Sequence, residues 1–399
     1  MHDILFDFTY YQGSTAFHGG GEYGNVVLEE LLKQSEQINC GIFFFKGRKV
    51  DANMLRRCQE AGWNLHAICD FRNLAAIARD YKYTTIYSAL PYNGLWGRIN
   101  FSGSIRFIGT FHGLRSMELA DCEGDELYFY EQGNGRDSSG YIFGVQDQEQ
   151  QNKNKLVYDD AISMFKNGKI IAVSEHTKHS ICYHYPELQN ADIEVLYSPP
   201  KLTDVVQADE DKEILTAYQL SARNFGLIVS AGIWYKNGRR AILAYDRVFE
   251  RKYKFIHPDY KVVVLGVRKK ADFLNGVMNK ERFLLMDYVP TRNLEAFYRN
   301  AQLFVYPSLN EGFGYPPLEA MKYGTLCICS VNTSIAEVCR DMVLYFNPLL
   351  IEEIAIRILE SFSDKIRAEK EEKIRQQLPA VINRQEEDLQ KLVKIIIGK

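Results

Sequence analysis

The sequence predicts an α/β protein of two domains, each with a parallel sheet, and three observations support this fold class. The 399 residues are enough for about two domains of ordinary size. Short apolar runs alternate with helical stretches in both halves, which is typical of βαβ units whose sheets are covered on both faces. The composition, with 46% hydrophobic and 25% charged residues, is that of a globular protein. We therefore expect two Rossmann-like domains.

Composition and charge argue against several other classes of protein. The 48 basic and 51 acidic residues leave a net charge of −3, which gives the chain as a whole no attraction to nucleic acid. No apolar stretch approaches the ~20 residues that span a bilayer, and the N-terminus lacks the basic and apolar regions of a signal peptide. The eight cysteines include no C-x-x-C pair, which argues against structural zinc. We expect a reduced, cytoplasmic protein.

The first half reads as a series of βα units. Continuous apolar runs predict strands at residues 4–8, 40–45, 65–68, 85–89, 105–110, 170–173 and 193–197. Apolar residues at helical spacing predict helices from about Asn25 onward, at 52–61 and at 74–80. Ser174 is expected to cap the helix that follows the sixth strand. The polar stretch 120–157 is too long for an ordinary connector, so we expect an insertion or a mobile lid there.

A glycine-rich segment follows the first predicted strand. Gly20, Gly21, Glu22 and Tyr23 lie between that strand and the first predicted helix. In this setting the backbone N–H groups of a loop can hold a phosphate group. A run of glycines is also typical of a flexible turn, so both interpretations stay open.

The second half repeats the alternation of strands and helices. The expected strands are 227–231, 261–266, 283–286, 303–306 and 326–330, and the expected helices include 239–249 and 294–300. Residues 199–213 contain two prolines and a charged segment and are the expected linker. The predicted parts are an N-terminal domain at 1–200, a C-terminal domain at 201–380 and a terminal helix at 381–399.

The most informative stretch runs from Tyr306 to Glu319. It opens with the end of a predicted strand, continues through a loop, and enters a helix at Pro316 and Pro317, which suit the first helical turn because proline has no N–H. Glu311 therefore lies on a loop at the carboxyl end of a strand, and Glu319 lies about one turn into the helix. In an α/β sheet this edge is where ligands bind.

The residue types in this stretch suit a sugar nucleotide. Backbone N–H groups around Gly312, Phe313 and Gly314 can donate hydrogen bonds to hydroxyls or to an anion near the helix N-terminus. The two carboxylates can each accept hydrogen bonds from vicinal hydroxyls, worth roughly 1.5–3 kcal/mol per bond. Either glutamate alone would be explained as a solvated acid or as a helix acid favoured by the macrodipole. Together with the glycines and prolines, they indicate a binding site.

This motif resembles that of a known family. The run P-S-x-x-E-G-F-G-Y-P-P-L-E, at 307–319, is similar to the signature of the retaining family 4 glycosyltransferases, of the glycosyl transferases group 1 type. The similarity extends to Lys236-Asn237 and to residues 287–290, 332–334 and 345–348. It covers much of the C-terminal half of the chain and only patches of the N-terminal half.

The resemblance implies a fold and a reaction. The fold is GT-B, in which two Rossmann-like domains with parallel sheets face each other across a cleft. The enzyme would transfer a sugar from a nucleoside diphosphate sugar to a hydroxyl of a growing glycan or lipid-linked saccharide, with retention of configuration. No metal and no further cofactor are implied. The setting would be polysaccharide biosynthesis in the cytoplasm, with peripheral contact to the inner face of the membrane where the acceptor is lipid-linked.

The resemblance also assigns roles to single residues. Glu319 would hold the ribose hydroxyls, while Glu311 and the amides of Gly312 to Gly314 would hold the donor sugar. Lys236 would neutralise the diphosphate leaving group. His112, directly after the strand 105–110, would contact the sugar from the N-terminal domain, although a lone histidine is more often a structural residue.

Three further segments are assigned with less specific signals. Asn332 and Ser334 match residues that line the donor site in the family, but capping of the next helix would also explain them. The segment 20–23 would lie near the donor phosphates and the acceptor. The stretch 120–157 would shape the acceptor side of the N-terminal domain.

The chain departs from the family at one position. The family has an arginine a few residues before the lysine that matches Lys236, and this sequence has none there. Arg239, Arg240 or Arg268 could substitute for it. The alternatives to a transferase are a GT-B-fold nucleotide-sugar epimerase, a phosphorylase, for which no pyridoxal phosphate signature is visible, and a non-catalytic subunit that binds sugar nucleotides.

The terminal helix has an apolar stripe. Leu389, Leu392, Val393 and Ile396 recur at helical spacing. In the GT-B fold the terminal helix crosses back onto the first domain, so we expect the stripe to pack there. A helix on a membrane surface is the alternative, because lysines accompany the stripe.

Overall fold

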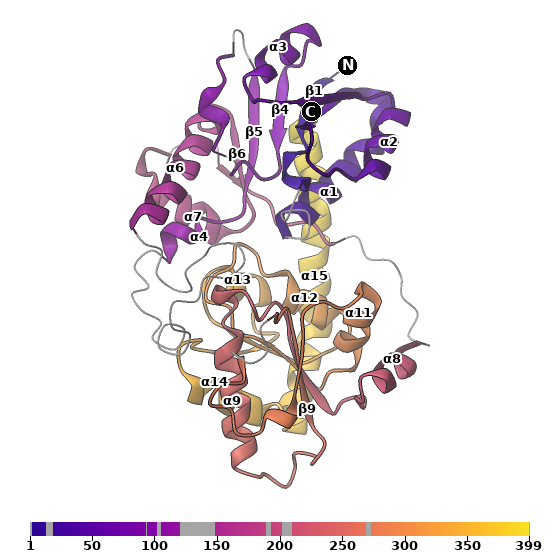
Figure 1. Cartoon of the computed structure of the whole chain (residues 1–399), viewed down its shortest axis with the longest axis vertical. Coiled ribbons are helices and arrows are strands. Elements are labelled where there is room, and N and C mark those ends of the chain that lie inside the picture. The colour runs from indigo at the N-terminus through magenta and orange to yellow at the C-terminus, as the bar shows by residue number, and fades with distance from the viewer. Residues whose placement is uncertain are drawn as a thin grey trace. The chain divides into compact units, whose positions relative to one another are not determined.

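The computed structural model describes residues 2–12, 19–92, 94–101, 105–119, 148–188, 193–201, 210–268 and 273–398. The chain forms two compact units (Figure 1). Unit 1 consists of Met1–Glu118, Asp147–Thr203 and Ile382–Lys399, and unit 2 of Leu119–Gln146 and Asp204–Val381. Each unit is therefore assembled from segments that are far apart in the sequence. The predicted domains at 1–200, 201–380 and 381–399 stay predictions.

The described part of unit 1 contains a seven-stranded parallel sheet with the order β3-β2-β1-β4-β5-β6-β7. The strands are β1 (His2–Asp7), β2 (Ile38–Phe45), β3 (Asn64–Ile68), β4 (Thr85–Ser88), β5 (Arg106–Phe111), β6 (Lys169–Ala172) and β7 (Ile193–Val195). The α-helices are α1 (Gly19–Leu32), α2 (Ala52–Glu60), α3 (Asn73–Asp80), α4 (Arg115–Glu118), α6 (Gln148–Phe165) and α7 (Glu175–His184). Short 3-10 helices are η1 (Thr9–Tyr11), η3 (Ser35–Gln37), η4 (Trp96–Arg98) and η5 (Pro186–Leu188).

Helices cover both faces of this sheet. Helices α1 and α2 lie on one face, and α6 and α7 lie on the other (Figure 1). The core of the second face is aromatic: the fully buried ring of Trp96 lies 5.1 Å from the rings of both Phe71 and Phe165, centroid to centroid. Its indole N–H donates to the Pro91 carbonyl at 2.9 Å, so the only polar atom of this side chain is satisfied. Such burial on both faces explains why the strands read as continuous apolar runs.

The predicted start of the first helix is wrong. Helix α1 begins at Gly19 and not near Asn25, so the predicted phosphate loop of Gly20, Gly21, Glu22 and Tyr23 lies in the first turns of a helix. Close packing explains the glycines that sequence reasoning assigned to a loop. A Cβ atom at Gly24 would overlap the ring of Tyr10, and one at Gly20 would lie 3.0 Å from Leu90. The glycines therefore let the helix lie close to its neighbours.

Two other predicted segments differ in part. The last ten residues of the expected insertion 120–157 belong to α6, whose residues Ala161, Ile162 and Phe165 are buried. Residues 120–147 lie outside the described part of the chain. The expected linker 199–213 overlaps residues 202–209, which are also outside it, and its last three residues begin helix α8 (Asp211–Ala217).

Unit 2 contains, among its described residues, a six-stranded parallel sheet with the order β10-β9-β8-β11-β12-β13. The strands are β8 (Phe225–Ile228), β9 (Lys261–Leu265), β10 (Phe283–Met286), β11 (Leu303–Tyr306), β12 (Cys327–Ser330) and β13 (Leu344–Phe346). The helices are α9 (Gly238–Glu250), α11 (Thr291–Asn300), α12 (Tyr315–Lys322), α13 (Ser334–Cys339), α14 (Ile351–Glu360) and α15 (Asp364–Ile397), with η7 (Trp234–Lys236) and η8 (Lys280–Arg282). Buried residues of neighbouring strands, such as Ile228, Val264 and Val305, pack with Tyr245 of α9 and Ile354 of α14 into one core.

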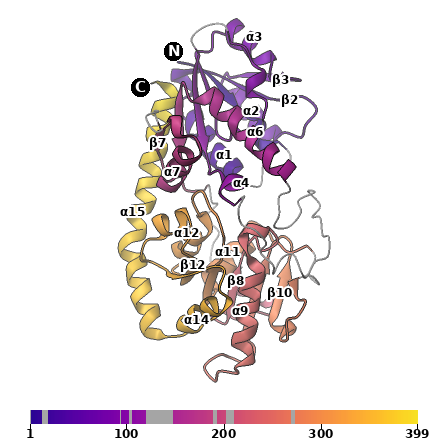
Figure 2. The ribbon, with the colours of Figure 1, turned by 90° about the vertical axis from the view of Figure 1, so that its left-hand side faces the viewer.

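Helix α15 ends in unit 1. It is drawn in yellow in Figure 2 and runs through Pro379 without interruption. Its apolar stripe is buried, with Leu392, Val393 and Ile396 at most 1% exposed. The Arg106 guanidinium donates to the Ile396 carbonyl at 2.9 Å, and the backbone N–H of Tyr197 donates to Asp388 Oδ2 at 2.8 Å. The protein itself therefore covers the stripe that a membrane-surface helix would expose.

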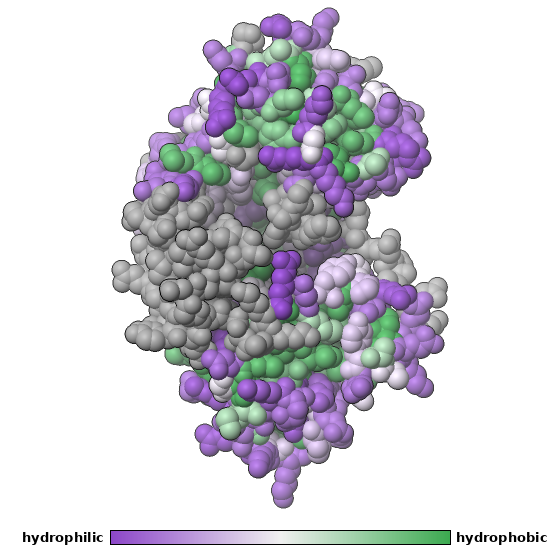
Figure 3. Space-filling view, in the orientation of Figure 1, coloured by the Kyte–Doolittle hydropathy of each residue, from purple (hydrophilic) through white to green (hydrophobic). Residues whose placement is uncertain are grey.

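The surface is mixed in character. On the face shown in Figure 3, hydrophilic and hydrophobic side chains alternate over the coloured parts of both units. Among the residues that the structure describes, no helix combines the length and the hydrophobicity that crossing a bilayer requires.

Candidate functional site

The candidate site begins where two loops of unit 2 meet. Strands β8 and β11 pair in parallel, and the chain continues from β8 toward β9 on one side and from β11 toward β12 on the other. At such a reversal of strand order the loops at the carboxyl ends diverge, and ligands of α/β sheets bind there. Lys236 lies in the loop after β8, and Glu311 lies in the loop after β11.

Lys236 and Glu311 form an ion pair at this point. The Lys236 Nζ atom lies 2.6 Å from Glu311 Oε1 and also donates to the Tyr306 hydroxyl at 3.1 Å. The Ser308 hydroxyl donates to the same carboxylate oxygen at 2.5 Å. The side chains of Lys236 and Glu311 are only 13% and 8% exposed, so each charge depends on the other for compensation. The structure thus brings together the residues expected to hold the diphosphate and the donor sugar.

Tyr306 completes this cluster. It is the last residue of β11, is 1% exposed, and its hydroxyl accepts a hydrogen bond from Lys236 Nζ beside the ion pair. Burial, followed by the negative charge of Glu311, raises the pKa of Tyr306 well above its ordinary value. The phenol therefore stays protonated and serves Lys236 as a neutral acceptor. Sequence reasoning missed this residue because a tyrosine in an apolar strand is normally a core residue.

Asn237 fixes the loop that carries Lys236. Its backbone adopts the left-handed conformation with φ of 57°, which asparagine tolerates better than most residues. The side chain is fully buried and donates from Nδ2 to the carbonyls of Pro307 at 3.0 Å and Pro348 at 2.8 Å. Its Oδ1 accepts from Arg240 at 3.0 Å. One asparagine therefore joins the loops after β8, β11 and β13.

The three arginines considered as substitutes for the family's missing arginine have different surroundings. Arg239 is 4% exposed and donates to the Phe273 carbonyl at 2.7 Å. Arg240 is 6% exposed and holds Asn237. Arg268 has a side chain that is 72% exposed and lies 3.5 Å from Asp287. Arg239 and Arg240 are thus buried and form hydrogen bonds within the fold, whereas the side chain of Arg268 is mostly exposed to solvent.

The glycine loop leads into α12 as the sequence predicts. Gly314 has a φ of 96°, a conformation that glycine adopts without strain, and immediately precedes the helix. Pro316 and Pro317 lie in the first turn, which confirms their predicted place. Glu319 follows one turn later, and its Oε2 accepts a hydrogen bond from the Tyr298 hydroxyl at 3.3 Å. Phe313 is 4% exposed and anchors the loop between the two glutamates.

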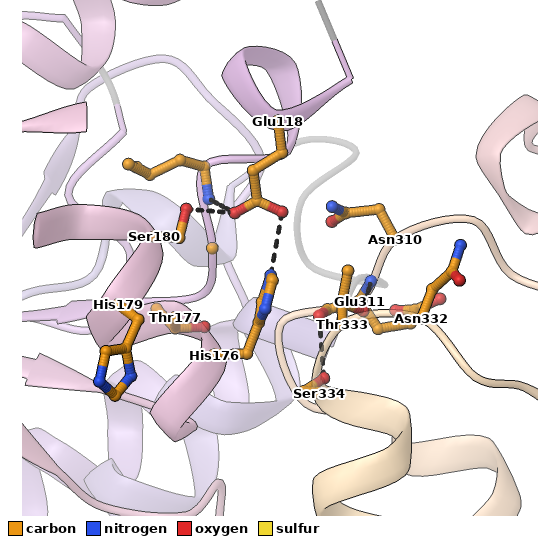
Figure 4. Close-up of polar contacts among 12 residues, drawn as sticks. Glu118, His176, Thr177, His179, Ser180, Asn310, Glu311, Asn332, Thr333 and Ser334 are labelled. Carbon is orange, nitrogen blue, oxygen red and sulfur yellow. Dashed lines mark hydrogen bonds and ion pairs between the residues drawn. The ribbon is translucent and has the colours of Figure 1, made fainter. Parts of the chain in front are cut away.

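Three side chains after β12 hold the backbone of the Glu311 loop (Figure 4). The Thr333 hydroxyl oxygen accepts from the backbone N–H of Glu311 at 3.0 Å, and the Ser334 hydroxyl donates to the Glu311 carbonyl at 2.8 Å. Asn332 Nδ2 donates to the Leu309 carbonyl at 3.2 Å. The alternative explanation, in which Asn332 and Ser334 cap the next helix, is wrong, because the N-cap residue of α13 is Thr333 and the helix has no side-chain cap bond. The Thr333 hydroxyl is engaged by Glu311 instead.

Thr333 is also strained. Its backbone has φ of 54° and ψ of −135°, which is rare for any residue other than glycine and most unfavourable for a β-branched side chain. Strain of this kind costs about 1–3 kcal/mol and is retained where the surrounding structure imposes it, often at functional sites. The hydroxyl bond to the Glu311 N–H gives a reason for a threonine at a position that suits glycine.

Replacing Thr333 by valine is expected to raise about tenfold the KM for the sugar-nucleotide donor that the sequence motif predicts. Valine keeps the shape of threonine but offers no acceptor to the Glu311 N–H, and an unpaired buried N–H costs about 1–3 kcal/mol. Thr333→Ser keeps the hydroxyl and should restore the wild-type KM. Thr333→Gly relieves the backbone strain but lacks the acceptor, so it should share the kinetic defect of valine without its loss of stability. Wild-type kinetics in Thr333→Val would show that the bond does not position Glu311.

Unit 1 holds the predicted residue His112. It directly follows β5, and its Nε2 lies 2.9 Å from the Ala89 carbonyl oxygen. Because a carbonyl only accepts, Nε2 carries the proton of the neutral ring and Nδ1 carries the lone pair. Burial lowers the pKa of His112 to about 4, against the opposing effect of the Ala89 bond. The edge of its ring meets Tyr23 of α1 at 4.8 Å between centroids.

A buried carboxylate lies at the reversal of strand order in unit 1. Asp7 ends β1 and is fully buried, and its Oδ2 accepts from the hydroxyl of Ser88, the last residue of the neighbouring strand β4, at 2.7 Å. Its Oδ1 accepts from the N–H of Thr9 at 2.9 Å and from the Thr9 hydroxyl at 2.6 Å. Burial raises the pKa of Asp7 to about 6 despite these donors. Sequence reasoning read this position only as the end of an apolar strand.

The remaining predicted residues of unit 1 lie in helix α1. Glu22 is in its first turn and pairs with Lys201 at 2.9 Å. Tyr23 is 1% exposed, and its hydroxyl lies 3.4 Å from that of Thr110 on β5. The proposed ligand roles of these residues and of His112 stay predictions.

Comparisons with known proteins identify a family for most of the sequence that forms unit 2. Residues 212–379 match the family described as glycosyl transferases group 1. The O-antigen chain mannosyltransferase B of Escherichia coli is 32% identical over 157 residues, which are 38% of this chain and 40% of that protein. The O-antigen chain mannosyltransferase RfbU of Salmonella typhimurium is 29% identical over 189 residues, 45% of this chain and 46% of that protein. The matched segments thus span less than half the length of either relative.

The fold itself is shared along the whole chain. WaaG, a glycosyltransferase involved in lipopolysaccharide biosynthesis, superimposes with a TM-score of 0.64 over 99% of this chain and 100% of that chain, at 12% sequence identity. Identity this low shows the fold alone, and the fold is GT-B with two Rossmann-like units. The family match and the mannosyltransferase relatives support a glycosyltransferase.

Proposed function

We propose that this protein transfers a mannosyl residue from a nucleoside diphosphate mannose to a hydroxyl of a growing glycan or lipid-linked saccharide, with retention of configuration. The observation that carries the proposal is the buried Lys236–Glu311 pair at the reversal of strand order in unit 2. The printed names of the relatives support the choice of mannose. They also support a role in assembling a surface polysaccharide, which would place the protein in the cytoplasm at the inner face of the membrane.

Lys236 is suited to a diphosphate. Its ammonium group has three N–H donors, and the contacts described above direct two of them to Glu311 and Tyr306. The third can reach a phosphate oxygen without breaking the pair. A fixed cation in a largely buried site stabilises the negative charge that develops on the leaving phosphate, and stabilisation of this type is usually the largest single contribution to catalysis. The reaction we propose needs no metal and no further cofactor.

The two carboxylates, Glu311 and Glu319, would contact different parts of the donor. Glu311, held by Ser308 on its side chain and by Thr333 and Ser334 on its backbone, would accept hydrogen bonds from the donor sugar. Glu319, held by Tyr298, would accept from the ribose hydroxyls. No carboxylate is assigned as a covalent nucleophile, so retention would follow from a front-face displacement.

The alternatives have less support. A nucleotide-sugar epimerase or a phosphorylase would use the same fold, but the matched family and relatives are transferases. A non-catalytic subunit was favoured only by the missing arginine, and the Lys236–Glu311 pair argues against it. Product analysis with and without a saccharide acceptor distinguishes the transferase from these alternative functions.

The proposal is tested by thermal denaturation with GDP, UDP, ADP, dTDP, CMP and their sugar conjugates. A ligand at 100 times its Kd stabilises the native state by about 2.7 kcal/mol, which gives a clear rise in Tm. Glu319→Gln should weaken the binding of the active nucleotide about 10- to 100-fold, because it removes charge-assisted hydrogen bonds to the ribose. The matched control is Glu352→Gln, an exposed carboxylate on α14 of the same unit. If no nucleotide raises Tm, or if Glu319→Gln binds like the control, the assigned donor site is wrong.

A further inference from the structure

The side chains of Lys236, Glu311 and Tyr306 meet in unit 2, but only one of the three residues belongs to the sheet. Lys236 ends the short 3-10 helix η7, and Glu311 lies in the loop after β11. Tyr306 is the last residue of β11, which pairs with β8 on one side and with β12 on the other. Its Cα atom lies opposite that of Cys329 of β12. The sheet therefore holds the backbone of Tyr306 in place.

The side chain of Tyr306 is also more rigid than that of Lys236. A tyrosine ring is oriented by two torsion angles, whereas lysine carries its charge on a flexible four-carbon stem. Tyr306 is 1% exposed, and its ring stacks with that of Phe304 at 6.0 Å between centroids. Buried side chains in close-packed surroundings occupy rotamer minima. The hydroxyl of Tyr306 is thus a fixed point at the carboxyl end of β11.

The three polar groups form a closed ring of hydrogen bonds. Lys236 Nζ donates to Glu311 Oε1 at 2.6 Å and to the Tyr306 hydroxyl at 3.1 Å. The Tyr306 hydroxyl is in turn hydrogen-bonded to Glu311. A carboxylate only accepts and an ammonium group only donates, so the phenol accepts from Lys236 and donates to Glu311. Each of the three groups therefore restricts the other two.

The bond to Tyr306 orients the cation. An ammonium group has three N–H donors in a tetrahedral arrangement. If it were bonded to Glu311 alone, it could still rotate about that bond, but the second bond stops the rotation and so sets the direction of the third N–H. The rings of Tyr306 and Tyr235, whose centroids lie 5.3 Å and 5.5 Å from Nζ, enclose the ammonium further. Without the hydroxyl, the ammonium would be drawn toward the carboxylate.

We propose that Tyr306 is a positioning residue of the transfer reaction, whose hydroxyl restrains the ammonium group of Lys236 from moving closer to Glu311 and directs one N–H to the diphosphate of the donor. The inference rests on the proposed function, because it concerns the step in which charge develops on the leaving phosphate. Catalysis by a fixed charge depends on where the charge is held, and a displacement of about 1 Å can lower a rate about 10²-fold. Tyr306 acts through Lys236 and makes no contact with the substrate in this proposal.

The variant Tyr306→Phe tests the hydroxyl by itself. Phenylalanine keeps the ring, its stacking with Phe304 and its contact with the ammonium group. The matched control is Tyr260→Phe in the same unit. Tyr260 is 1% exposed and donates to Gln302 Oε1 at 2.8 Å, but it directly precedes β9 and so lies at the opposite edge of the sheet. Both variants lose one buried hydroxyl, so a loss of stability alone should affect their kinetics alike.

The measurement is the release of nucleoside diphosphate from GDP-mannose, or from the mannose conjugate of another base that the panel selects, with octyl α-D-mannopyranoside as acceptor. Tyr306→Phe is expected to lower kcat about tenfold and to change the KM for the donor less than about twofold, because a displaced cation costs most where the charge on the phosphate is largest. Tyr260→Phe should have wild-type kinetics. A wild-type kcat in Tyr306→Phe, or an equal loss in the control, would overturn the proposal.

A double-mutant cycle tests whether Tyr306 acts through Lys236. Lys236→Met and Tyr306→Phe are each compared with the variant that carries both substitutions. If the hydroxyl only places the ammonium group, Tyr306→Phe should change kcat less than about twofold once Lys236 is methionine. If the two losses multiply instead, Tyr306 acts independently of Lys236 and the proposal is wrong. A wild-type kcat in Lys236→Met would contradict the proposed function and this inference with it, whereas a loss there without a loss in Tyr306→Phe would contradict this inference alone.

Discussion

Replacing Lys236 by methionine is expected to lower kcat by about 10²- to 10³-fold, which is the effect of removing one group that stabilises developing charge in a preorganised site. Methionine has nearly the length of lysine but no charge, so in the proposed reaction the leaving phosphate would lose its cation. The measurement is the steady-state rate with the donor identified by thermal denaturation and with an excess of acceptor. Lys236→Arg should recover only part of the rate, because the planar guanidinium cannot occupy the position of Nζ between Glu311 and Tyr306.

A double variant separates this effect from loss of folding. Lys236→Met alone leaves the Glu311 carboxylate largely buried without its partner, which should lower the free energy of unfolding by about 3–5 kcal/mol. Lys236→Met combined with Glu311→Gln removes both charges and should recover most of that stability, while the activity stays low. Recovery of activity in the double variant would mean that Lys236 is needed for the fold and not for the chemistry. An unchanged stability in Lys236→Met would mean that the pair is weaker than its burial indicates.

In the wild type, the contributions of Asp7 and His112 to the pH dependence of the unfolding free energy are expected to cancel. Removing either residue should therefore make the unfolding free energy change with pH. Burial raises the pKa of Asp7 from 3.8 to about 6 and lowers that of His112 from 6.5 to about 4. Each displacement corresponds to about 3 kcal/mol of unfolding free energy. The two effects have opposite signs over almost the same range of pH.

The signs follow from which state binds the proton. Folded Asp7 holds its proton more tightly than the unfolded chain, so its contribution is complete below pH 3.8 and is lost as the pH rises through about 6. Folded His112 holds its proton less tightly, so its contribution is complete above pH 6.5 and is lost as the pH falls through about 4. Between these limits one contribution grows as the other declines.

The test is urea denaturation between about pH 4 and pH 6.5 for the wild type, Asp7→Asn and His112→Gln. Relative to the wild type, the free energy of unfolding of Asp7→Asn should rise with pH by about 3 kcal/mol across this range, because the His112 effect remains alone. That of His112→Gln should fall by about the same amount. Other titrating groups are common to the three proteins and cancel in the comparison. Parallel curves for all three would show that neither group is buried as described.

Much of the fold could be predicted from the sequence because its strands are buried on both faces. Two predicted strands, residues 283–286 and 303–306, have the observed bounds of β10 and β11, because each is a continuous apolar run. All four residues of β11 are buried, as expected of a central parallel strand, whereas buried and partly buried residues alternate in the edge strand β10. The start of α12 was also predicted, because proline suits the first turn of a helix, where its missing N–H costs nothing. Local rules of this kind need no knowledge of the neighbouring elements.

The errors and omissions arise from contacts between distant residues. Gly24 is a glycine because Tyr10, fourteen positions earlier, occupies the space of its Cβ, and no local pattern distinguishes that from a loop. Thr333 lies at the start of a helix, but its hydroxyl accepts a hydrogen bond from the backbone N–H of Glu311, which lies in the loop after the neighbouring strand β11. Tyr306 reads as core because the charges around its hydroxyl come from elsewhere in the chain. The glutamates were found only because they belong to a motif.

The assignment of residues 382–399 to unit 1 has a consequence for how the protein is made. A ribosome delivers the chain from the N-terminus, so the described strands of unit 1 emerge long before the end of α15, where Leu392, Val393 and Ile396 are buried. The larger segment of unit 2, Asp204–Val381, is synthesised in the interval. The nascent N-terminal half therefore waits with an uncovered apolar surface, which is the condition in which chains aggregate or recruit chaperones. Unit 1 therefore has all of its segments only after residues Asp204–Val381 of unit 2 have been made.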